Sequence, residues 1–315
     1  MQSLVFSGTP VMSMNNKFET KSAFVAIVGR PNVGKSSLLN ALIGEKVAAV
    51  SAKPQTTRTR ITGILTKGLT QFVFIDTPGL HKPKTKLADF MVKQVGDSVA
   101  DVDIAILVVE PKGELTQPER DLIERFKALR LPAILCINKI DTLENKEEML
   151  AKIAMLSKEY TFDEVIPISA LKKDGINILT DELEKYAEEG PHYFADDSIT
   201  DQPERAIVAE LIRERMLVDL EDEVPHGIAV SIEAMKEREG KDMVDIDAII
   251  YCERDSHKGI IIGKKGAMLK KIGSEARTSV ERFLGCKVNL QLWVKVKEDW
   301  RNRDGLLRNF GFTEQ

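Results

Sequence analysis

The stretch that decides the fold is Gly29-Arg30-Pro31-Asn32-Val33-Gly34-Lys35-Ser36, between an apolar run at 23–28 and a helical pattern at 37–43. It matches G-x-x-x-x-G-K-[ST] in the strand–loop–helix context that this phosphate-binding motif requires. Its glycines let backbone N–H groups turn toward phosphate oxygens, and the helix N-terminus adds partial positive charge. We expect Lys35 to reach the β- and γ-phosphates and Ser36 to ligate Mg²⁺. The predicted nucleotide contacts here are Gly29, Asn32, Val33, Gly34, Lys35, Ser36 and Ser37.

A second apolar run ends in Asp76-Thr77-Pro78-Gly79. Asp76 can hold Mg²⁺ through a water molecule, and the Gly79 N–H can detect the γ-phosphate by a hydrogen bond. Between the two motifs lies a polar loop at 53–58, in which we expect Thr57, rather than Thr56, to ligate Mg²⁺ while the γ-phosphate is bound. Both threonines can equally be ordinary loop residues. Lys35, Thr57 and Gly79 are the candidate catalytic residues.

The base-recognition signal is the run at 133–137 followed by Asn138-Lys139-Ile140-Asp141. A buried Asp141 carboxylate can accept hydrogen bonds from N1–H and the 2-amino group of guanine, whereas adenine would leave it unpaired. Asn138 can brace the surrounding loops, and the Lys139 stem can lie over the base. Ser169-Ala170 follows a further apolar run, and we expect the Ala170 N–H to donate to guanine O6.

Apolar and helical patterns alternate along the first part of the chain. This alternation predicts an α/β fold with a mostly parallel, doubly wound sheet covered on both faces. The phosphate, Mg²⁺ and base signals all fall where strands end, which is where such folds bind ligands. The predicted strands lie near 23–28, 61–66, 71–76, 102–109, 132–138 and 163–168, and the predicted helices near 35–43, 86–99, 117–129, 146–159 and 175–189. The predicted organisation is a disordered extension at 1–21, a nucleotide-binding domain at 22–189, a linker at 190–203 and a second domain at 204–315.

The second domain follows the order helix, two alternating strands, short helix, Gly263-Lys264-Lys265-Gly266, helix and strand. This order resembles a small α+β KH domain of type II, whose G-x-x-G loop clamps about four nucleotides of single-stranded RNA. Residues 255–303 carry twelve Lys/Arg and five Asp/Glu, a net +7 that leaves −11 for the rest of the chain. We therefore expect a polyanionic partner for this domain. The predicted RNA contacts are Ile261, Ile262, Gly263, Lys264, Lys265, Gly266 and Lys270, with Ile260, Ile261 and Ile262 as an apolar platform for bases.

Two tryptophans and several basic residues follow this loop. Trp293 and Trp300 can stack on bases or pack inside the protein; we favour packing for Trp293 and leave Trp300 open. The basic residues can extend a phosphate track or form a solvated face; they are Lys295, Lys297, Arg301 and Arg303.

The whole motif series resembles the translation-factor-related GTPases and, among them, is most similar to the Era-type GTPases. The resemblance rests on G-R-P-N-V-G-K-S, K-P-Q-T-T-R, D-T-P-G-L, N-K-I-D and the KH-like module, and it covers nearly everything from residue 22 onward. It implies a GTP-hydrolysing switch, with GTP/GDP and Mg²⁺ bound, that contacts small-subunit ribosomal RNA near its 3′ end and assists small ribosomal subunit assembly. Leu80 stands where many GTPases have a water-orienting Gln, so we expect slow hydrolysis. The resemblance also suggests a K⁺ ion held by Asn32, while Arg30 and Arg58 are candidate arginine fingers by position only.

Composition narrows the class of protein further. A hydrophobic share of 43% and a charged share of 30% are ordinary for a folded protein, and no apolar run has the length of a membrane span. Three scattered cysteines and no secretory signal pattern at the N-terminus predict a cytoplasmic protein, and no heptads suggest an oligomer, so we expect a monomer. Two alternatives stay open. One is an RNA-binding module with GTP as a structural ligand, and the other is a signalling GTPase peripheral on the inner face of the cell membrane.

Overall fold

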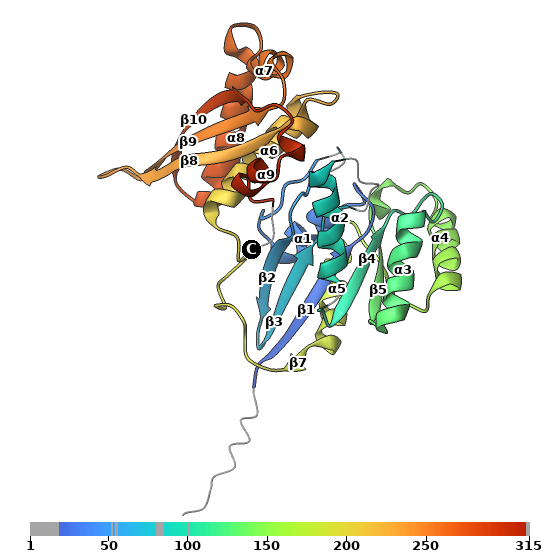
Figure 1. The fold of residues 1–315 in the computed structure, drawn as a ribbon. Helices are drawn as coiled ribbons and strands as arrows, with labels where there is room; N and C mark the ends of the chain where they lie inside the picture. Colours follow the sequence, from blue (N-terminus) through green and yellow to red (C-terminus); the bar gives the residue numbers. More distant parts are fainter. Residues whose placement is uncertain (1–18, 52, 54–55, 80–84, 100, 313–315) are drawn as a thin grey trace, which may run out of the picture.

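The computed structural model describes residues 19–51, 53, 56–79, 85–99 and 101–312 (Figure 1). Two modules are present, each built on its own sheet. The larger module comprises β1 (Lys21–Val28), α1 (Lys35–Ile43), β2 (Ile61–Lys67), β3 (Thr70–Asp76), α2 (Lys86–Ser98), β4 (Ile104–Val109), α3 (Gln117–Leu129), β5 (Ala133–Ile137), η1 (Ile140–Thr142), α4 (Lys146–Glu159), β6 (Glu164–Pro167), α5 (Ile176–Leu183), η2 (Glu184–Tyr186) and β7 (Glu188–Glu189). The smaller module comprises α6 (Glu204–Asp219), η3 (Pro225–Gly227), β8 (Ala229–Glu237), β9 (Met243–Cys252), α7 (Asp255–Ile262), η4 (Lys264–Gly266), α8 (Ala267–Leu284), β10 (Lys287–Val296), η5 (Trp300–Asn302) and α9 (Asp304–Asn309).

The larger sheet has the strand order β2-β3-β1-β4-β5-β6. The pairs from β3 to β6 are parallel, whereas β2 runs antiparallel to β3. Its central strands are buried on both faces because their apolar residues feed two cores: α1 and α5 pack on one face, and α3 and α4 on the other. The predicted α/β architecture is confirmed, and the phosphate, Mg²⁺ and base motifs meet at the carboxyl ends of β1, β3 and β5.

The smaller sheet has the order β10-β9-β8, with β8 antiparallel and β10 parallel to β9. One face carries α6, α7 and α8, which share a single apolar core with the inward residues of the strands. Helix α8 spans the residues predicted from the sequence, because Gly266 (φ 79°) precedes it and Gly285 (φ 70°) ends it in the left-handed conformation that glycine adopts at low cost. This α+β module has the predicted element order.

The segment that leaves the larger module departs from prediction in two ways. The last helix does not continue to residue 189, because α5 ends at Leu183 and β7 then pairs antiparallel with the start of β1. The predicted linker 190–203 also lies along the larger module rather than hanging free. The buried side chain of Gln71 accepts hydrogen bonds from Tyr193 N (2.8 Å) and Phe194 N (3.0 Å) and donates to Phe194 O (3.0 Å). The backbone N–H of Ile64 donates to Ile199 O farther along.

The C-terminal segment joins the two modules. Trp300 is fully buried in a small apolar cluster that combines Leu87 and Met91 of α2 with Leu307 and Phe312 of the tail. Lys86 at the start of α2 forms an ion pair with Asp304 at 2.7 Å. Packing, rather than stacking on a base, is therefore the role of Trp300, which the sequence left open.

Replacement of Gln71 by Ala is expected to loosen the segment after β7. The change removes the oxygen that accepts from both the Tyr193 and the Phe194 amide, and a buried polar group left unpaired costs about 1–3 kcal/mol. Amide hydrogen exchange over 190–203 should therefore accelerate by about 5- to 150-fold. The exposed Gln291→Ala is the matched control and should leave this exchange unchanged. Equal exchange in both variants would show that Gln71 does not hold the segment.

Candidate nucleotide site and RNA interface

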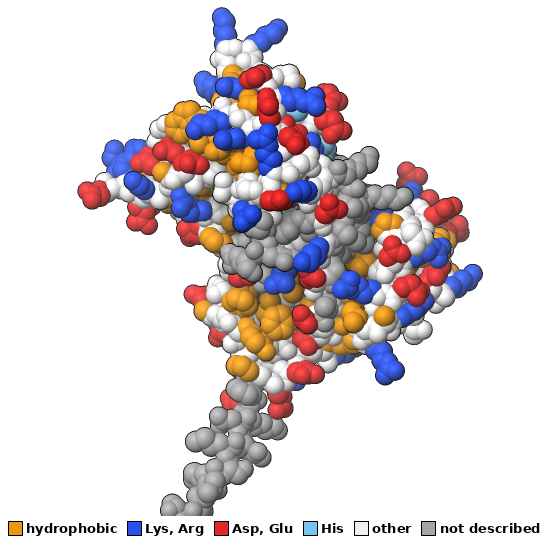
Figure 2. Space-filling view, in the orientation of Figure 1, with side chains coloured by type: hydrophobic (Ala, Val, Ile, Leu, Met, Phe, Trp, Pro, Cys, Tyr) orange, Lys and Arg blue, Asp and Glu red, His pale blue; other side chains and the backbone are white. Residues whose placement is uncertain are grey.

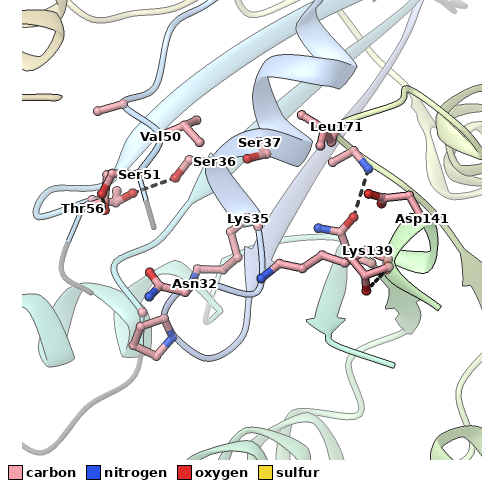
Figure 3. Close-up of a pocket in the computed structure, with 18 residues that line it drawn as sticks. Asn32, Lys35, Ser36, Ser37, Val50, Ser51, Thr56, Lys139, Asp141 and Leu171 are labelled. Atoms are coloured by element: carbon pink, nitrogen blue, oxygen red, sulfur yellow. Dashed lines mark hydrogen bonds between the residues drawn. The ribbon is translucent and has the colours of Figure 1, made fainter. Parts of the chain in front are cut away.

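A pocket of about 510 Å³ opens at the carboxyl edge of the larger sheet (Figure 3). Figure 3 shows Ser51 and Thr56 at one end, Asp141 and Leu171 at the other, and Lys35 with Ser36 between them. The predicted residues that line it are Asn32, Gly34, Lys35, Ser36, Ser37, Thr57, Gly79, Asn138, Lys139, Asp141 and Ala170. Gly29, Val33, Asp76 and Ser169 lie outside this lining.

The phosphate loop is shaped by contacts that exclude side chains. Gly34 has φ 97°, and a Cβ there would lie 2.2 Å from the Asn138 amide nitrogen. The Lys35 Nζ donates to the carbonyls of Gly29 (3.1 Å) and Arg30 (2.9 Å), so the ammonium lies within the loop that is to receive phosphate. Burial lowers the pKa of Lys35 to about 8, against the opposing charge of Asp76. A phosphate anion would restore a strong partner to this cation.

Three oxygen-bearing side chains converge beside the phosphate loop. The Ser36 hydroxyl donates to Asp76 Oδ2 at 2.7 Å and lies 2.7 Å from the Thr57 hydroxyl. Burial raises the pKa of Asp76 to about 6, while Lys35 and the bond from Ser36 act in the opposite direction. Asp76 Oδ1 is buried without a hydrogen-bond partner. Hard oxygen ligands with one unsatisfied carboxylate oxygen fit Mg²⁺, which binds through few protein groups and keeps several waters.

The neighbouring threonine is placed differently. The Thr56 hydroxyl donates to Lys53 O and lies 2.7 Å from the Ser51 hydroxyl, so it takes part in the turn of the loop rather than in the oxygen cluster. Of the two threonines, Thr57 is the one that the structure places beside Ser36.

Gly79 is constrained by the phosphate loop itself. A Cβ on Gly79 would lie 2.6 Å from the Cα of Pro31, so only glycine fits this approach. This close packing places the start of the second motif against the phosphate loop. Leu80, which stands at the position of the water-orienting Gln, lies outside the described residues.

Asn138 ties three loops together at the base end of the pocket. Its Nδ2 donates to Val33 O (2.8 Å), and its Oδ1 accepts from Ala170 N (3.0 Å). The bracing role predicted for Asn138 therefore has its contacts in the structure. The Ala170 N–H already has this internal partner, so donation to guanine O6 remains a prediction.

Asp141 lies at the open base end of the same pocket. It is exposed rather than buried, and the Ser169 hydroxyl donates to its Oδ1 at 2.5 Å. Its exposure contradicts the expectation of a buried carboxylate, because Asp141 follows β5 on the short turn η1 at the pocket mouth. Lys139 forms an ion pair with Glu110.

Sequence reasoning missed part of the pocket wall. Val50 and Ser51 come from the loop after α1, and Thr142 and Leu171 directly follow predicted residues. Leu171 is 78% exposed at the base end, where an apolar side chain can cover a flat base. The sequence signal that could have identified Leu171 was its position directly after Ser169-Ala170.

Neither arginine proposed as a finger points at the phosphate site. Arg30 turns away to Glu119 (3.0 Å) and Glu110 (3.6 Å). The Arg30 Nε and Glu119 Oε1 atoms are close but lack hydrogen-bond geometry, so this contact is an ion pair only. Glu119, which also caps α3 together with Thr116, is fully buried and retains Arg30 as its counter-charge.

Arg58 extends from the larger module into the smaller one. It is 2% exposed and donates to the carbonyls of Ile228 (2.5 Å) and His226 (2.9 Å). Its guanidinium lies 5.8 Å from the ring centre of Trp300, whose indole N–H donates to Gly227 O. Burial lowers the pKa of Arg58 to about 9, with the positive charge of Arg213 the next cause, and the group remains charged at neutral pH.

Other residues of the loop between α1 and β2 contact α6 of the smaller module. Lys46 forms an ion pair with Glu214 at 2.7 Å, Lys53 donates to Leu220 O, and Arg213 donates to Thr56 O. The loop that carries Thr57 is thus shared between the nucleotide pocket and the smaller module.

The predicted RNA loop projects from the tip of the smaller module, where α7 meets α8 (Figure 1), and basic side chains extend from that tip in Figure 2. Gly263 has φ 71° and ψ 177°, a conformation essentially confined to glycine, and Lys265 has φ 50°. Lys264, Lys265 and Lys270 are all exposed. The backbone can therefore approach a phosphate closely between two unhindered cations.

A groove of about 520 Å³ runs from this loop between α8 and β10. Gly266 and Lys270 line it at the loop end, and sequence reasoning missed the remaining wall. That wall consists of Leu269, Gly273, Ser274, Arg277, Asn289, Leu290 and Leu292.

Two predictions about the smaller module are wrong. The three consecutive isoleucines cannot form one platform, because they lie on a helix: Ile261 is fully buried in the core, Ile260 is 50% exposed, and Ile262 is partly buried. The side chain of Ile261 is thus unavailable to a base. Trp293 does not pack inside either, because its position on β10 points away from the helices and leaves it 46% exposed.

Comparison with known proteins gives a consistent result. A family model described as a 50S ribosome-binding GTPase matches residues 24–139, and a KH domain model matches residues 223–301. GTPase Era of Clostridioides difficile is 52% identical over 295 residues, covering 94% of this chain and 99% of the relative. GTPase Era of Caldanaerobacter subterraneus is 51% identical over 293 residues, covering 93% and 98%.

Solved structures agree with these relatives. A crystal structure of an Aquifex aeolicus Era variant bound to GDP·AlF4⁻ has a TM-score of 0.89 and 39% identity, covering 94% of this chain and 100% of the other. A structure of Era with MgGDPNP and nucleotides 1506–1542 of 16S ribosomal RNA has the same TM-score, identity and coverage.

Replacement of Thr57 by Ala is expected to weaken binding of a GTP analogue while sparing GDP. The Thr57 hydroxyl lies in the oxygen cluster. If Thr57 binds Mg²⁺ only while the γ-phosphate is present, it does not stabilise the GDP-bound state. The preference for analogue over GDP in Mg²⁺ should fall by about fivefold or more, as one lost hydrogen bond to a charged group implies. Titration calorimetry measures it, and Thr56→Ala is the adjacent control. An equal loss in both variants would assign the effect to the loop as a whole.

Proposed function

Because the chain belongs to the Era family of GTPases, we propose that it is a GTP-hydrolysing switch that binds small-subunit ribosomal RNA near its 3′ end and assists small ribosomal subunit assembly. The family is clear from identity over nearly the full length of the relatives. The RNA assignment draws on the solved Era complex with 16S ribosomal RNA nucleotides.

The observation that carries the switch is the placement of two consecutive residues. Thr57 contacts Ser36 in the nucleotide pocket, while Arg58 is buried against the backbone of η3 in the smaller module. Adjacent Cα atoms are about 3.8 Å apart, so a γ-phosphate that draws Thr57 inward must displace Arg58 or the module that Arg58 holds. This supports a direct mechanical link between nucleotide state and docking of the smaller module.

The chain's own groups would handle GTP as follows. Lys35 neutralises charge on the β- and γ-phosphates, the N–H groups around Gly34 orient them, and Gly79 approaches the γ-phosphate. Ser36 and Thr57, with Asp76 through a water molecule, would hold Mg²⁺, which would supply charge neutralisation on the transferring phosphoryl group. Asp141 selects guanine. Neither Arg30 nor Arg58 reaches the phosphates, so we expect slow intrinsic hydrolysis.

The smaller module presents two features suited to single-stranded RNA. Lys264 and Lys265 flank a backbone that phosphate can approach closely, and the groove behind them has Leu290 and Leu292 beside Asn289 on its β10 wall. Such a groove accepts unstacked bases while the loop holds the backbone. We assign the RNA-contacting role to Gly263, Lys264, Lys265, Gly266 and Lys270. Ile262, which directly precedes this loop, lies at the edge of the proposed contact surface.

Two alternative functions are less well supported by the contacts. GTP as a purely structural ligand does not account for Arg58 and Thr57 sharing one loop. For membrane association, the basic residues around Gly263 and Gly266 surround a loop shaped for close approach of a nucleic-acid backbone, which favours RNA over lipid. Separately, no helix in the described ranges is both long and apolar enough to cross a bilayer. We keep a cytoplasmic monomer as the expected state and peripheral membrane contact as the lesser alternative, which pelleting with anionic vesicles tests.

RNA affinity is expected to depend on the bound nucleotide. We would measure binding of the 3′ segment of small-subunit ribosomal RNA to protein loaded with a GTP analogue or with GDP, and expect tighter binding with the analogue. Lys264→Glu with Lys265→Glu should lower both affinities by about tenfold or more through lost phosphate contacts. This pair is a cleaner control than Gly263→Asp, whose Cβ would lie 2.7 Å from Met268 Cβ.

Arg58→Ala should abolish the nucleotide dependence without removing RNA binding. The loss of its carbonyl contacts frees the loop from the smaller module, so both nucleotide states should bind RNA equally. Arg58→Lys keeps the charge and guards against loss of folding, and the exposed Arg60→Ala is the matched control. A difference between states that persists in both Arg58 variants would disprove the proposed link.

Potassium is expected to stimulate hydrolysis. Asn32 lines the pocket beside the phosphates with φ 64°, and an ion held there would take the place of the missing arginine finger. Phosphate release should therefore be faster in KCl than in NaCl at equal ionic strength, and Asn32→Ala should remove the difference. Equal rates of phosphate release in KCl and NaCl for the unchanged protein would disprove potassium stimulation.

A further inference from the structure

Trp293 is a large aromatic side chain at an open edge. It lies on β10, the edge strand of the smaller sheet, and its indole is 46% exposed. Its register partner Ile249 on β9 is buried to 7% exposure. The next pair on this face, Lys295 with Tyr251, adjoins the C-terminal tail, where Tyr251 packs on Phe310 with ring centres 4.9 Å apart. The described part of the tail thus covers the end of the sheet face at Tyr251.

The same strand forms a wall of the RNA groove. Leu290 and Leu292 point from β10 into the groove, while Trp293 points to the opposite face of the sheet. Successive side chains of a strand alternate between faces, and the neighbouring strand spacing is about 4.8 Å. Because β10 is an edge strand, no further strand separates the groove from the Trp293 face. A nucleotide leaving the groove can reach the indole around this edge.

Unpaired positive charge lies on the Trp293 side of β10. Lys287 and Lys295 of β10, and Lys297 directly after it, each stand an even number of residues from Trp293. All three are exposed, and within the described part of the chain none forms an ion pair. On the groove side, Lys270 and Arg277 also form no ion pair with any described residue. Two carboxylates lie on the same face: Asp247 stands opposite Gln291, and Asp245, opposite Asn289, is paired with Arg238. Figure 2 shows Lys and Arg side chains beside apolar ones over the smaller module.

We propose that Trp293 forms a stacking subsite for a nucleotide base of single-stranded RNA that continues out of the groove around β10, with Lys295 and Lys297 close to its phosphates. The proposal rests on the RNA-binding function argued above and extends it to the face of the sheet away from the groove. Stacking on an aromatic ring accepts any base, because every base has a π-face. The subsite would therefore add affinity and length preference rather than base selection.

Fluorescence offers a direct test, because the chain has two tryptophans and Trp300 is fully buried. A base stacked on Trp293 should quench the emission and protect it from acrylamide. We would titrate full-length protein with the 3′ segment of small-subunit ribosomal RNA and with truncations from each end down to four nucleotides. Quenching should appear with the long RNA and vanish in Trp293→Phe. A long RNA that binds without quenching would overturn the subsite.

Affinities separate the subsite from the groove. Trp293→Ala should weaken the long RNA by about 5- to 150-fold, the range for one base stacked on an aromatic ring, and leave the best-binding tetranucleotide unchanged. Trp293→Phe should retain most of the affinity. Leu129→Ala removes an apolar side chain of equal exposure from the larger module and is the matched control.

Each remaining outcome has a definite meaning. Equal loss for long and short RNA would show that Trp293 supports the groove and would overturn the subsite. Unchanged affinity for both would also overturn it, while the proposed RNA binding would stand. Failure of unchanged protein to bind any of these RNAs would overturn the proposed function and the subsite together.

Discussion

The loop between α1 and β2 contributes residues to two sites at once, and the arrangement of both modules depends on it. Between α1 and β2, Thr57 belongs to the oxygen cluster of the nucleotide pocket, and Arg58 belongs to the smaller module. A buried guanidinium is costly unless its donors are paired, and here backbone carbonyls of the smaller module supply that pairing. The charge of Arg58 therefore requires the docked arrangement, and that arrangement determines where Thr57 lies. The two sites therefore share one short stretch of backbone.

The pocket itself has a different source of rigidity. Asn138 bonds the phosphate loop on one side and the loop at Ala170 on the other, and it lies so close to Gly34 that no Cβ fits between them. The distance between the phosphate end and the base end is thus set by backbone contacts. Against this fixed frame, the loop carrying Thr57 and helix α2 are the elements that touch the smaller module. The division is useful for a switch, because recognition of guanine stays constant while the response to the γ-phosphate varies.

Local signals in the sequence account for most of the fold and for the composition of the nucleotide pocket. Apolar runs marked the buried strands, and glycines marked both ends of α8, because these features act within a few residues of themselves. The errors share a different cause. Arg30 and Arg58 were candidate arginine fingers by position only, and each is held instead by a partner distant in sequence, Glu119 or the backbone at 226–228. The segment after Leu183 likewise follows Gln71 and β1 rather than its own helical pattern. Ile261 shows the opposite situation, because a local signal was overlooked. Consecutive residues of a helix point in different directions, so three neighbouring isoleucines could not form one platform.

The positive charge is gathered in one part of the smaller module rather than spread over all of it. Residues 255–303 carry +7 and the rest of the chain −11, so RNA is attracted to one region of the molecule and repelled by the remainder. At physiological ionic strength the screening length is about 8 Å, so each nucleotide responds mainly to the charges it nearly touches. The acidic part therefore limits where a strand can run without weakening the hold of the basic loop. Such a strand is favoured over the basic part of the smaller module, where β10 presents Lys287 and Lys295 on one face and Leu290 and Leu292 to the groove on the other. Because these lysines and the groove share one strand, the docking of that module through Arg58 would, under the proposed link, control access to RNA.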